Sequence, residues 1–131
     1  MTDHSYGQRQ RMESHLRDVN HRDSVLAALE KTEVAKQRIA DTFGSSPTLV
    51  IVYVGLQRGM TQPEVAQALR DRGLPGASQP QVSIAEAKLE EAGFLRQPPK
   101  GRRVVREGWD EFGLNRALAK ILRNQGVPKL G

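Results

Sequence analysis

Five basic residues lie close together in the C-terminal half of the chain, and positions 94 to 106 hold no acidic residue. They are Arg96, Lys100, Arg102, Arg103 and Arg106. Such a cluster suits binding to the phosphates of a nucleic acid, because each basic contact releases a condensed counter-ion. The alternative is a solvated loop that its charges keep from aggregating. We expect Lys100, Arg102 and Arg103 to contact the DNA backbone or minor groove.

The cluster surrounds a predicted β-hairpin. Two short strand-like runs, 94–97 and 102–107, are joined by Pro98, Pro99, Lys100 and Gly101, which are typical of a turn. Because side chains alternate between the faces of a strand, Arg102 and Arg103 would point to opposite sides. Both therefore cannot reach the same groove.

A second candidate surface lies on the predicted helix 79–92. Ser78 or Gln79 would cap it, Pro80 fits its first turn, and Gly93 follows its end. At 100° per residue, one face carries Val82, Ala85, Leu89 and Ala92, and the remaining surface offers Ser78, Gln79, Gln81, Ser83, Ile84 and Lys88. Glutamine can pair with adenine, serine with several bases, and isoleucine with the thymine methyl group. The alternative is that the polar residues only cap the helix and contact water.

The second half of this helix is acidic, which is unexpected for a DNA-binding segment. Glu86, Glu90 and Glu91 stand against a single Lys88. Recognition helices present mainly their N-terminal turns to the bases, so the neutral start can still face DNA. We expect Glu86 at the edge of the core face, and Glu90 and Glu91 directed to solvent or to nearby arginines.

Enzymatic and metal-binding readings find little support. The chain has no cysteine, and its three histidines, at positions 4, 15 and 21, are irregularly spaced in a polar segment. No glycine-rich phosphate loop, paired-carboxylate signature or nucleophile motif is present. We therefore predict no catalytic residues, no metal site and no cofactor.

Length and charge suggest one DNA-binding domain with an arm. The 131 residues suffice for a single core, residues 1–21 read as a flexible polar arm, and residues 22–131 as the domain. Residues 94–131 hold 9 Lys or Arg against 3 Asp or Glu, whereas residues 61–93 hold 3 against 5. A polyanionic partner would thus be met mainly through the C-terminal third. The longest apolar run, 49–56, is too short to span a membrane, and we expect a cytoplasmic protein.

The remaining elements follow from spacing and caps. Residues 24–43 favour helix, either one long helix or two with Thr32 capping the second. The run 49–56 fits a buried strand or a buried helix. Thr61 and Glu64 form a capping-box pattern before a helix that ends at Gly73, and 109–124 carries a helical apolar stripe.

The order of these elements resembles the winged helix-turn-helix superfamily over about residues 46–124. The segment SQPQVSIAEAKLEEAGFL is similar to the recognition helix of ArsR-type and MarR-type regulators, although Glu86 stands where ArsR-type helices carry a core leucine. The resemblance implies a mainly α fold with a β-hairpin wing. It also favours a helix for 49–56, because a buried helix precedes the helix-turn-helix in these regulators.

The resemblance further implies a homodimer on double-stranded DNA. The core would be 46–108, and the flanking helices 22–44 and 109–124 would form the dimer interface. We expect a transcriptional regulator that reads sequence with helix 79–92 and is nucleoid-associated when bound. The first alternative is an architectural or plasmid- or virus-encoded DNA-maintenance protein of low sequence specificity. The second is a protein-interaction subunit of a larger assembly, which the acidic 61–93 segment favours.

Overall fold

The computed structural model describes residues 24–131, so the predicted arm 1–21 and the three histidines lie outside the described residues. The described residues fall into two units, 24–34 and 35–131. Helix α1 spans Ser24–Phe43. The Thr32 hydroxyl donates to the Ala28 carbonyl at 2.9 Å, a bond made inside a helix, so α1 is one helix and Thr32 caps no second segment.

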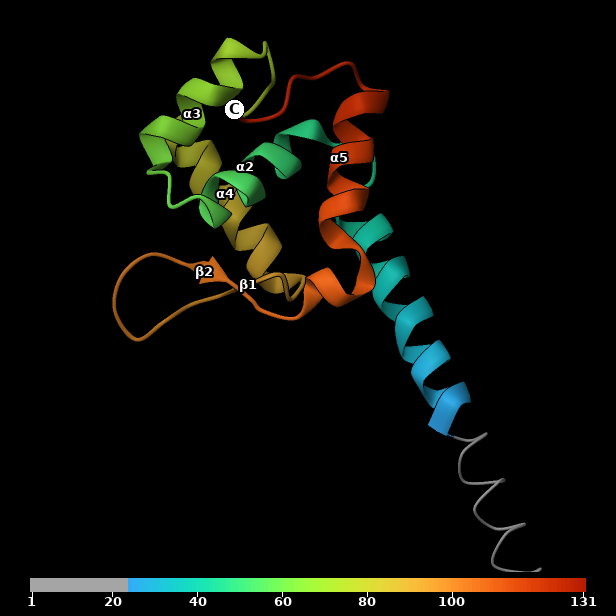
Figure 1. Ribbon diagram of the computed structural model, residues 1–131. Helices are drawn as coiled ribbons and strands as arrows, with labels where there is room; N and C mark the ends of the chain where they lie inside the picture. The colour runs from blue at the N-terminus through green and yellow to red at the C-terminus, as the bar shows by residue number, and fades with distance from the viewer. Residues whose placement is uncertain (1–23) are drawn as a thin grey trace, which may run out of the picture. The chain divides into compact units, whose positions relative to one another are not determined.

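Residues 35–131 are mainly helical, with one small sheet (Figure 1). After the end of α1 come α2 (Pro47–Gln57), α3 (Gln62–Asp71), α4 (Gln79–Glu91), β1 (Leu95–Arg96), β2 (Val104–Val105), the 3-10 helix η1 (Trp109–Phe112) and α5 (Leu114–Asn124). The predicted class, mainly α with a β-hairpin, is confirmed.

Helix α2 forms the centre of the core. Val50, Ile51, Val52 and Tyr53 are each at most 1% exposed, and a helix that is apolar on all sides must be covered on all sides. It packs against α3, α4, α5 and β2. Ser46 caps its first turn by accepting from the Leu49 N–H at 3.3 Å. The ambiguity between strand and helix is resolved as helix.

Helices α3 and α4 begin at the predicted caps. Thr61 and Glu64 form the reciprocal capping box of α3, and the hydrogen bond from the Thr61 backbone N–H lowers the pKa of Glu64. Ser78 caps α4 by accepting from the Gln81 N–H. Gly55 lets α2 and α3 approach closely, since a Cβ there would lie 2.7 Å from a methyl carbon of Val65.

The hairpin is shorter than predicted. Leu95 pairs with Val105, and Arg96 with Val104, in an antiparallel register. On the outer side, the Arg106 N–H still donates to the Phe94 carbonyl at 3.0 Å. On the inner side, the predicted strand residues Gln97, Arg102 and Arg103 belong to a wide loop (Figure 1). Arg102 and Arg103 thus precede β2, and strand alternation does not govern where their side chains point.

The predicted helix 109–124 is wrong as a single element. Gly113 has a φ of +77°, a left-handed conformation that interrupts the helix between η1 and α5. Leu114, Leu118 and Leu122 of α5 are at most 5% exposed, so these residues pack on the chain's own core and leave no apolar surface of their own for the dimer interface expected of 109–124.

Within residues 24–131 no single helix is long and apolar enough to cross a membrane. Helices α1 and α2 taken together have the length and composition for a span, but the chain bends by 111° between them.

Candidate nucleic-acid interface

Helix α4 buries one face and leaves its N-terminal half accessible. Val82 and Leu89 are fully buried on the inner side. Outward lie the exposed Gln79, Gln81 and Lys88, together with Ile84, which is 59% exposed. Ser83 is half-buried, and Ser78 is exposed while its hydroxyl serves as the cap.

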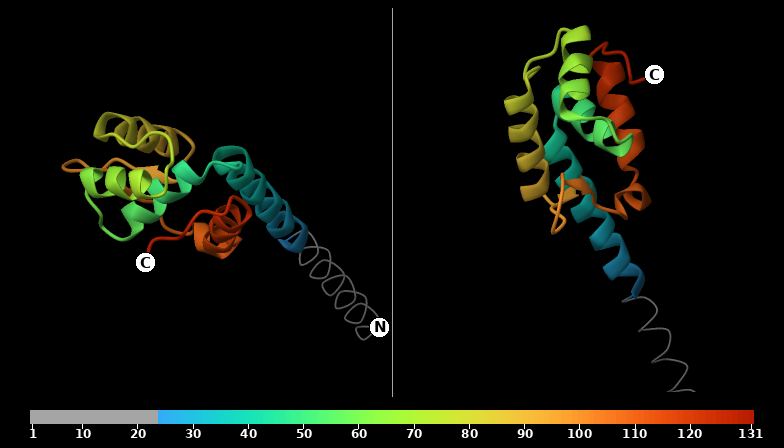
Figure 2. Two further views of the ribbon diagram at one scale, coloured as in Figure 1. Left: turned by 90° about the horizontal axis from the view of Figure 1, so that it is seen from above. Right: turned by 90° about the vertical axis from the view of Figure 1, so that its left-hand side faces the viewer.

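The hairpin lies beside α4. Strand β1 packs against α4, and both views of Figure 2 show the hairpin close to this helix at one side of the unit. Arg96, Lys100 and Arg106 are exposed, whereas Arg102 and Arg103 are half-buried. The predicted helix and hairpin residues are therefore brought together on neighbouring elements.

Arg102 turns inward to the acidic side of α4. Its Nη2 lies 2.9 Å from Oε2 of Glu86, a carboxylate whose side chain is 0% exposed. Arg102 also donates through Nη1 to the Met60 carbonyl, and its Nε makes a long contact of 3.5 Å with Glu86 Oε1. Glu86 therefore lies inside the core and not at its edge, and the charge of Arg102 satisfies it.

Arg103 forms a second ion pair with the same helix. Its Nε lies 2.6 Å from Oε1 of Glu90, and the two side chains are 24% and 36% exposed. The expectation that Glu90 points to solvent or to a nearby arginine is confirmed. Glu91 is exposed.

Two glutamines extend the buried pair toward the start of α4. Gln62 Nε2 donates to Glu86 Oε2 at 3.3 Å, and Gln79 Nε2 donates to Gln62 Oε1 at 3.4 Å. Sequence reasoning missed Gln62, because its place in the capping-box segment of α3 gave no sign that it faces α4. The available signal was Glu86, an acid in a helical position next to the buried Ala85.

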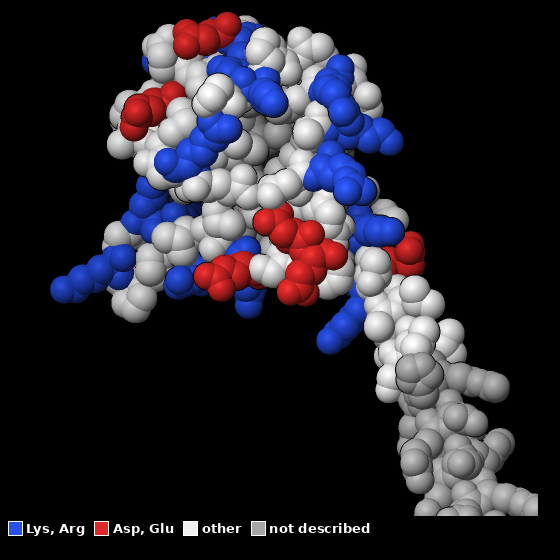
Figure 3. All heavy atoms as spheres, viewed as in Figure 1, with Lys and Arg blue, Asp and Glu red and all other residues white. Residues whose placement is uncertain are grey.

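Basic side chains lie over the hairpin, along α5 and at the top of the face shown in Figure 3, over α3. Acidic side chains lie between the hairpin group and the α5 group, near η1. The acids of that segment are Glu107, Asp110 and Glu111. The hairpin group is the one adjacent to α4, and its ion pairs join it to the second half of that helix at Glu86 and Glu90. The candidate interface therefore consists of this hairpin and the exposed start of the same helix.

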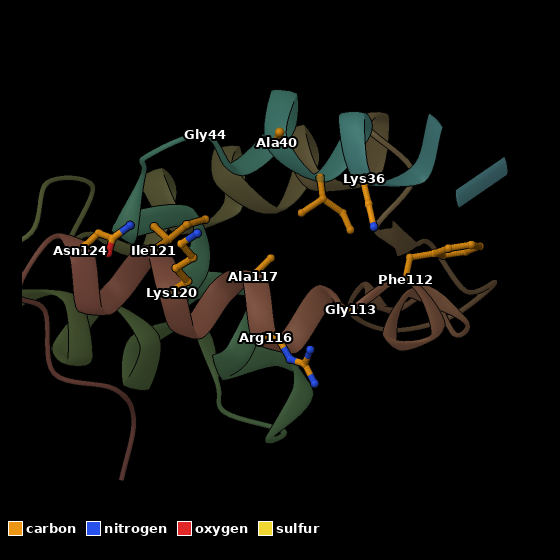
Figure 4. Close-up of a pocket in the computed structure, with 11 residues that line it drawn as sticks. Lys36, Ala40, Gly44, Phe112, Gly113, Arg116, Ala117, Lys120, Ile121 and Asn124 are labelled. Atoms are coloured by element: carbon orange, nitrogen blue, oxygen red, sulfur yellow. The ribbon is translucent and has the colours of Figure 1, made fainter. Parts of the chain in front are cut away.

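A groove of about 600 Å³ lies elsewhere in the same unit, between the end of α1 and α5. In Figure 4, Ala117 and Ile121 point from α5 toward α1, and Arg116 points away. Lys36, Arg116 and Lys120 are the charged residues around it. The groove is separate from the surface formed by α4 and the hairpin.

Among residues 24–131 no group of histidine or acidic side chains could hold a metal ion. Comparison of the chain with protein-family models, with curated proteins and with solved structures gives no match.

Proposed function

We propose that residues 35–131 form a winged helix-turn-helix domain that binds double-stranded DNA and acts as a transcriptional regulator. In this proposal α3 and α4 are the helix-turn-helix, and the hairpin of β1 and β2 is the wing. The observation that carries it is the accessible, uncharged N-terminal half of α4, on the same helix whose second half pairs with a basic hairpin. The order of elements in the sequence supports it further.

The start of α4 supplies specificity in this proposal. Gln79, Gln81 and Ser83 offer hydrogen-bonding groups, and Ile84 offers apolar surface for a thymine methyl group. Lys88 stands one turn beyond Ile84 and reaches the phosphates at the edge of the groove. The Ser78 cap positions the first turn, whose free backbone N–H groups favour a phosphate.

The hairpin supplies affinity. Arg96, Lys100 and Arg106 have exposed side chains suited to phosphate contact. Arg102 and Arg103 already satisfy Glu86 and Glu90, so each offers the DNA less charge than its type suggests. We propose Lys100 as the wing residue with the largest phosphate contact.

A homodimer completes the proposal. Val25, Leu26, Leu29 and Val34 of α1 are 45% to 63% exposed, which leaves apolar surface for a second copy. Two recognition helices would then meet half-sites about one helical turn, roughly 10 base pairs, apart. The protein would work in the cytoplasm, on the nucleoid when bound.

The test is selection of bound sequences from a random duplex pool. We expect an enriched palindrome with half-sites one turn apart, and loss of enrichment in a Gln81→Ala, Ser83→Ala variant. Enrichment without any palindrome would contradict the dimer. Recovery of unenriched DNA would favour the low-specificity architectural function instead.

A protein-interaction subunit is the second candidate, and one observation favours it. Ile84 exposes more than half of its surface in the middle of the candidate interface, as residues at protein interfaces often do. Absence of binding to any duplex at low salt, where backbone attraction is strongest, would support this function over the regulator.

A further inference from the structure

We propose that the buried Glu86 is the positioning residue of this interface: it neutralises Arg102 of the wing and, through Gln62, holds Gln79 at the start of the recognition helix. The inference rests on the proposed DNA-binding function. In this inference an inward-facing acid determines the ratio between the affinities for specific DNA and for random DNA.

Glu86 first fixes the charge that the hairpin presents. The Glu86 carboxylate has no exposed surface, and Arg102 lies against it at 2.9 Å, with its own side chain 29% exposed. A buried carboxylate requires a paired cation, so this guanidinium stays inside while Glu86 is ionised. The wing therefore presents one positive charge fewer to a DNA backbone than its sequence contains.

Glu86 also fixes the direction of two side-chain amides. Glu86 Oε2 accepts from both Arg102 and Gln62, and the Gln62 amide oxygen then accepts from Gln79. Gln62 can offer its oxygen to Gln79 because the acid occupies its NH₂ group, since an amide has one oxygen and one NH₂. The carboxylate thereby sets which group of Gln62 faces Gln79, and which group of Gln79 remains for a base.

Together these contacts should raise the discrimination between DNA sequences and lower the general attraction to the DNA backbone. Attraction to the backbone depends on the number of free cations and is the same for all sequences. Discrimination depends on the direction of amide groups such as that of Gln79. Removal of the Glu86 charge should weaken discrimination while it strengthens general binding, which a merely structural acid would not do.

The experiment measures affinity at several salt concentrations for two duplexes: the sequence that wild-type protein enriches from a random pool, and a scrambled duplex of equal length. In Glu86→Gln, which keeps the side-chain shape, Arg102 is no longer held by an ion pair. We expect tighter binding of the scrambled duplex, a slope of log affinity against log salt steeper by about 0.9, and roughly a tenfold lower ratio between the duplexes.

Two variants separate the effect of Glu86 on charge from its effect on the direction of the amides. Gln62→Ala leaves the ion pair intact and cuts the path to Gln79, so it should lower the ratio without altering the salt slope. Glu91→Gln removes the same charge from an exposed position of α4, and should change both affinities equally and leave the ratio at its wild-type value.

The outcomes distinguish this inference from the function on which it rests. A wild-type protein that enriches no sequence overturns the sequence-specific function. A wild-type protein that discriminates, together with an unchanged ratio in Glu86→Gln and Gln62→Ala, overturns only the role of Glu86.

A measurement without DNA tests the path directly. In the free protein, the side-chain amide resonances of Gln79 should shift in both Glu86→Gln and Gln62→Ala, and stay in place in Glu91→Gln. Unmoved resonances in the first two variants would overturn the path from Glu86 to Gln79, whatever the DNA results. Backbone resonances of α5 serve as the control for global folding.

Discussion

Arg102 and Arg103 are neighbours in the chain, yet the acids that they meet on α4 lie in different environments. Arg102 meets Glu86, which is 0% exposed, whereas Arg103 meets Glu90, which is 36% exposed. The two arginines themselves are similarly accessible, at 29% and 24%. The difference between the pairs therefore lies in the acid.

That difference determines what each pair does. An exposed pair gains little, because water and salt compete with each charge. A buried acid is costly without its partner, so Glu86 ties Arg102 to the helix much more firmly than Glu90 ties Arg103. The hairpin is thus anchored to α4 through Arg102, and Arg103 is available to exchange its partner.

Arg102→Ala should have the largest effect on stability. It leaves Glu86 buried without a cation, and we expect the free energy of unfolding to fall by about 3 kcal/mol. Urea denaturation at neutral pH measures this. A loss below about 1 kcal/mol would show that water reaches Glu86 and that the two pairs do not differ.

A double variant isolates the cause of that loss. Glu86→Leu combined with Arg102→Leu removes both charges, and apolar side chains can replace a buried ion pair at little cost. We expect it to be more stable than Arg102→Ala, because no charge then remains unpaired in the core. If the double variant were the less stable one, the lost contacts and not the orphan acid would explain the result.

Tyr53 extends the comparison to a buried group that titrates. Burial raises the pKa of Tyr53 to about 12, and the negative charge of Asp110 adds to the effect. In the unfolded chain the phenol loses its proton near pH 10, so the folded state holds one proton more between pH 10 and 12. Stability should therefore fall as pH rises through this window, by roughly 2 kcal/mol at its upper end.

Urea denaturation of wild type and Tyr53→Phe at pH 9, 10 and 11 checks this. The variant has no phenol at this position, so its stability should fall less steeply above pH 10. Parallel curves for the two proteins would mean that other groups cause the alkaline loss.

Local signals in the sequence were sufficient for much of the fold. The Thr61 and Ser78 caps depend on hydrogen bonds within one turn, so short patterns predicted both helix starts. The centre of the core was harder to predict, because a run that is apolar at nearly every position, such as 49–56, shows no periodicity that distinguishes a helix from a strand. The order of the elements around it was needed to favour helix.

The candidate site could be predicted only in outline. Helical spacing separated the inner and outer faces of α4, but it put Glu86 at the edge of the core, since periodicity cannot show that an arginine sixteen residues later will cover an acid. Gln62 was missed for the same reason. The break at Gly113 was missed because the apolar stripe on either side of it fits a single helix.

Arg103→Ala should have the smallest effect on stability. We expect a loss of less than about 1 kcal/mol in the free energy of unfolding, and no measurable loss in 1 M salt, where the exposed pair is screened. Glu90→Gln is its counterpart, because it removes the competing acid and leaves the arginine in place.

In the proposed DNA binding the same pair should matter more, because an exposed ion pair can exchange its partner. A phosphate then replaces Glu90 at the Arg103 guanidinium, so Arg103→Ala should weaken binding to specific and scrambled duplexes equally, and Glu90→Gln should strengthen both. Gel-shift titrations of the two variants at fixed salt provide the measurement. A stability loss in Arg103→Ala as large as that in Arg102→Ala would refute the comparison, because burial of the acid would then not determine which arginine anchors the hairpin to α4.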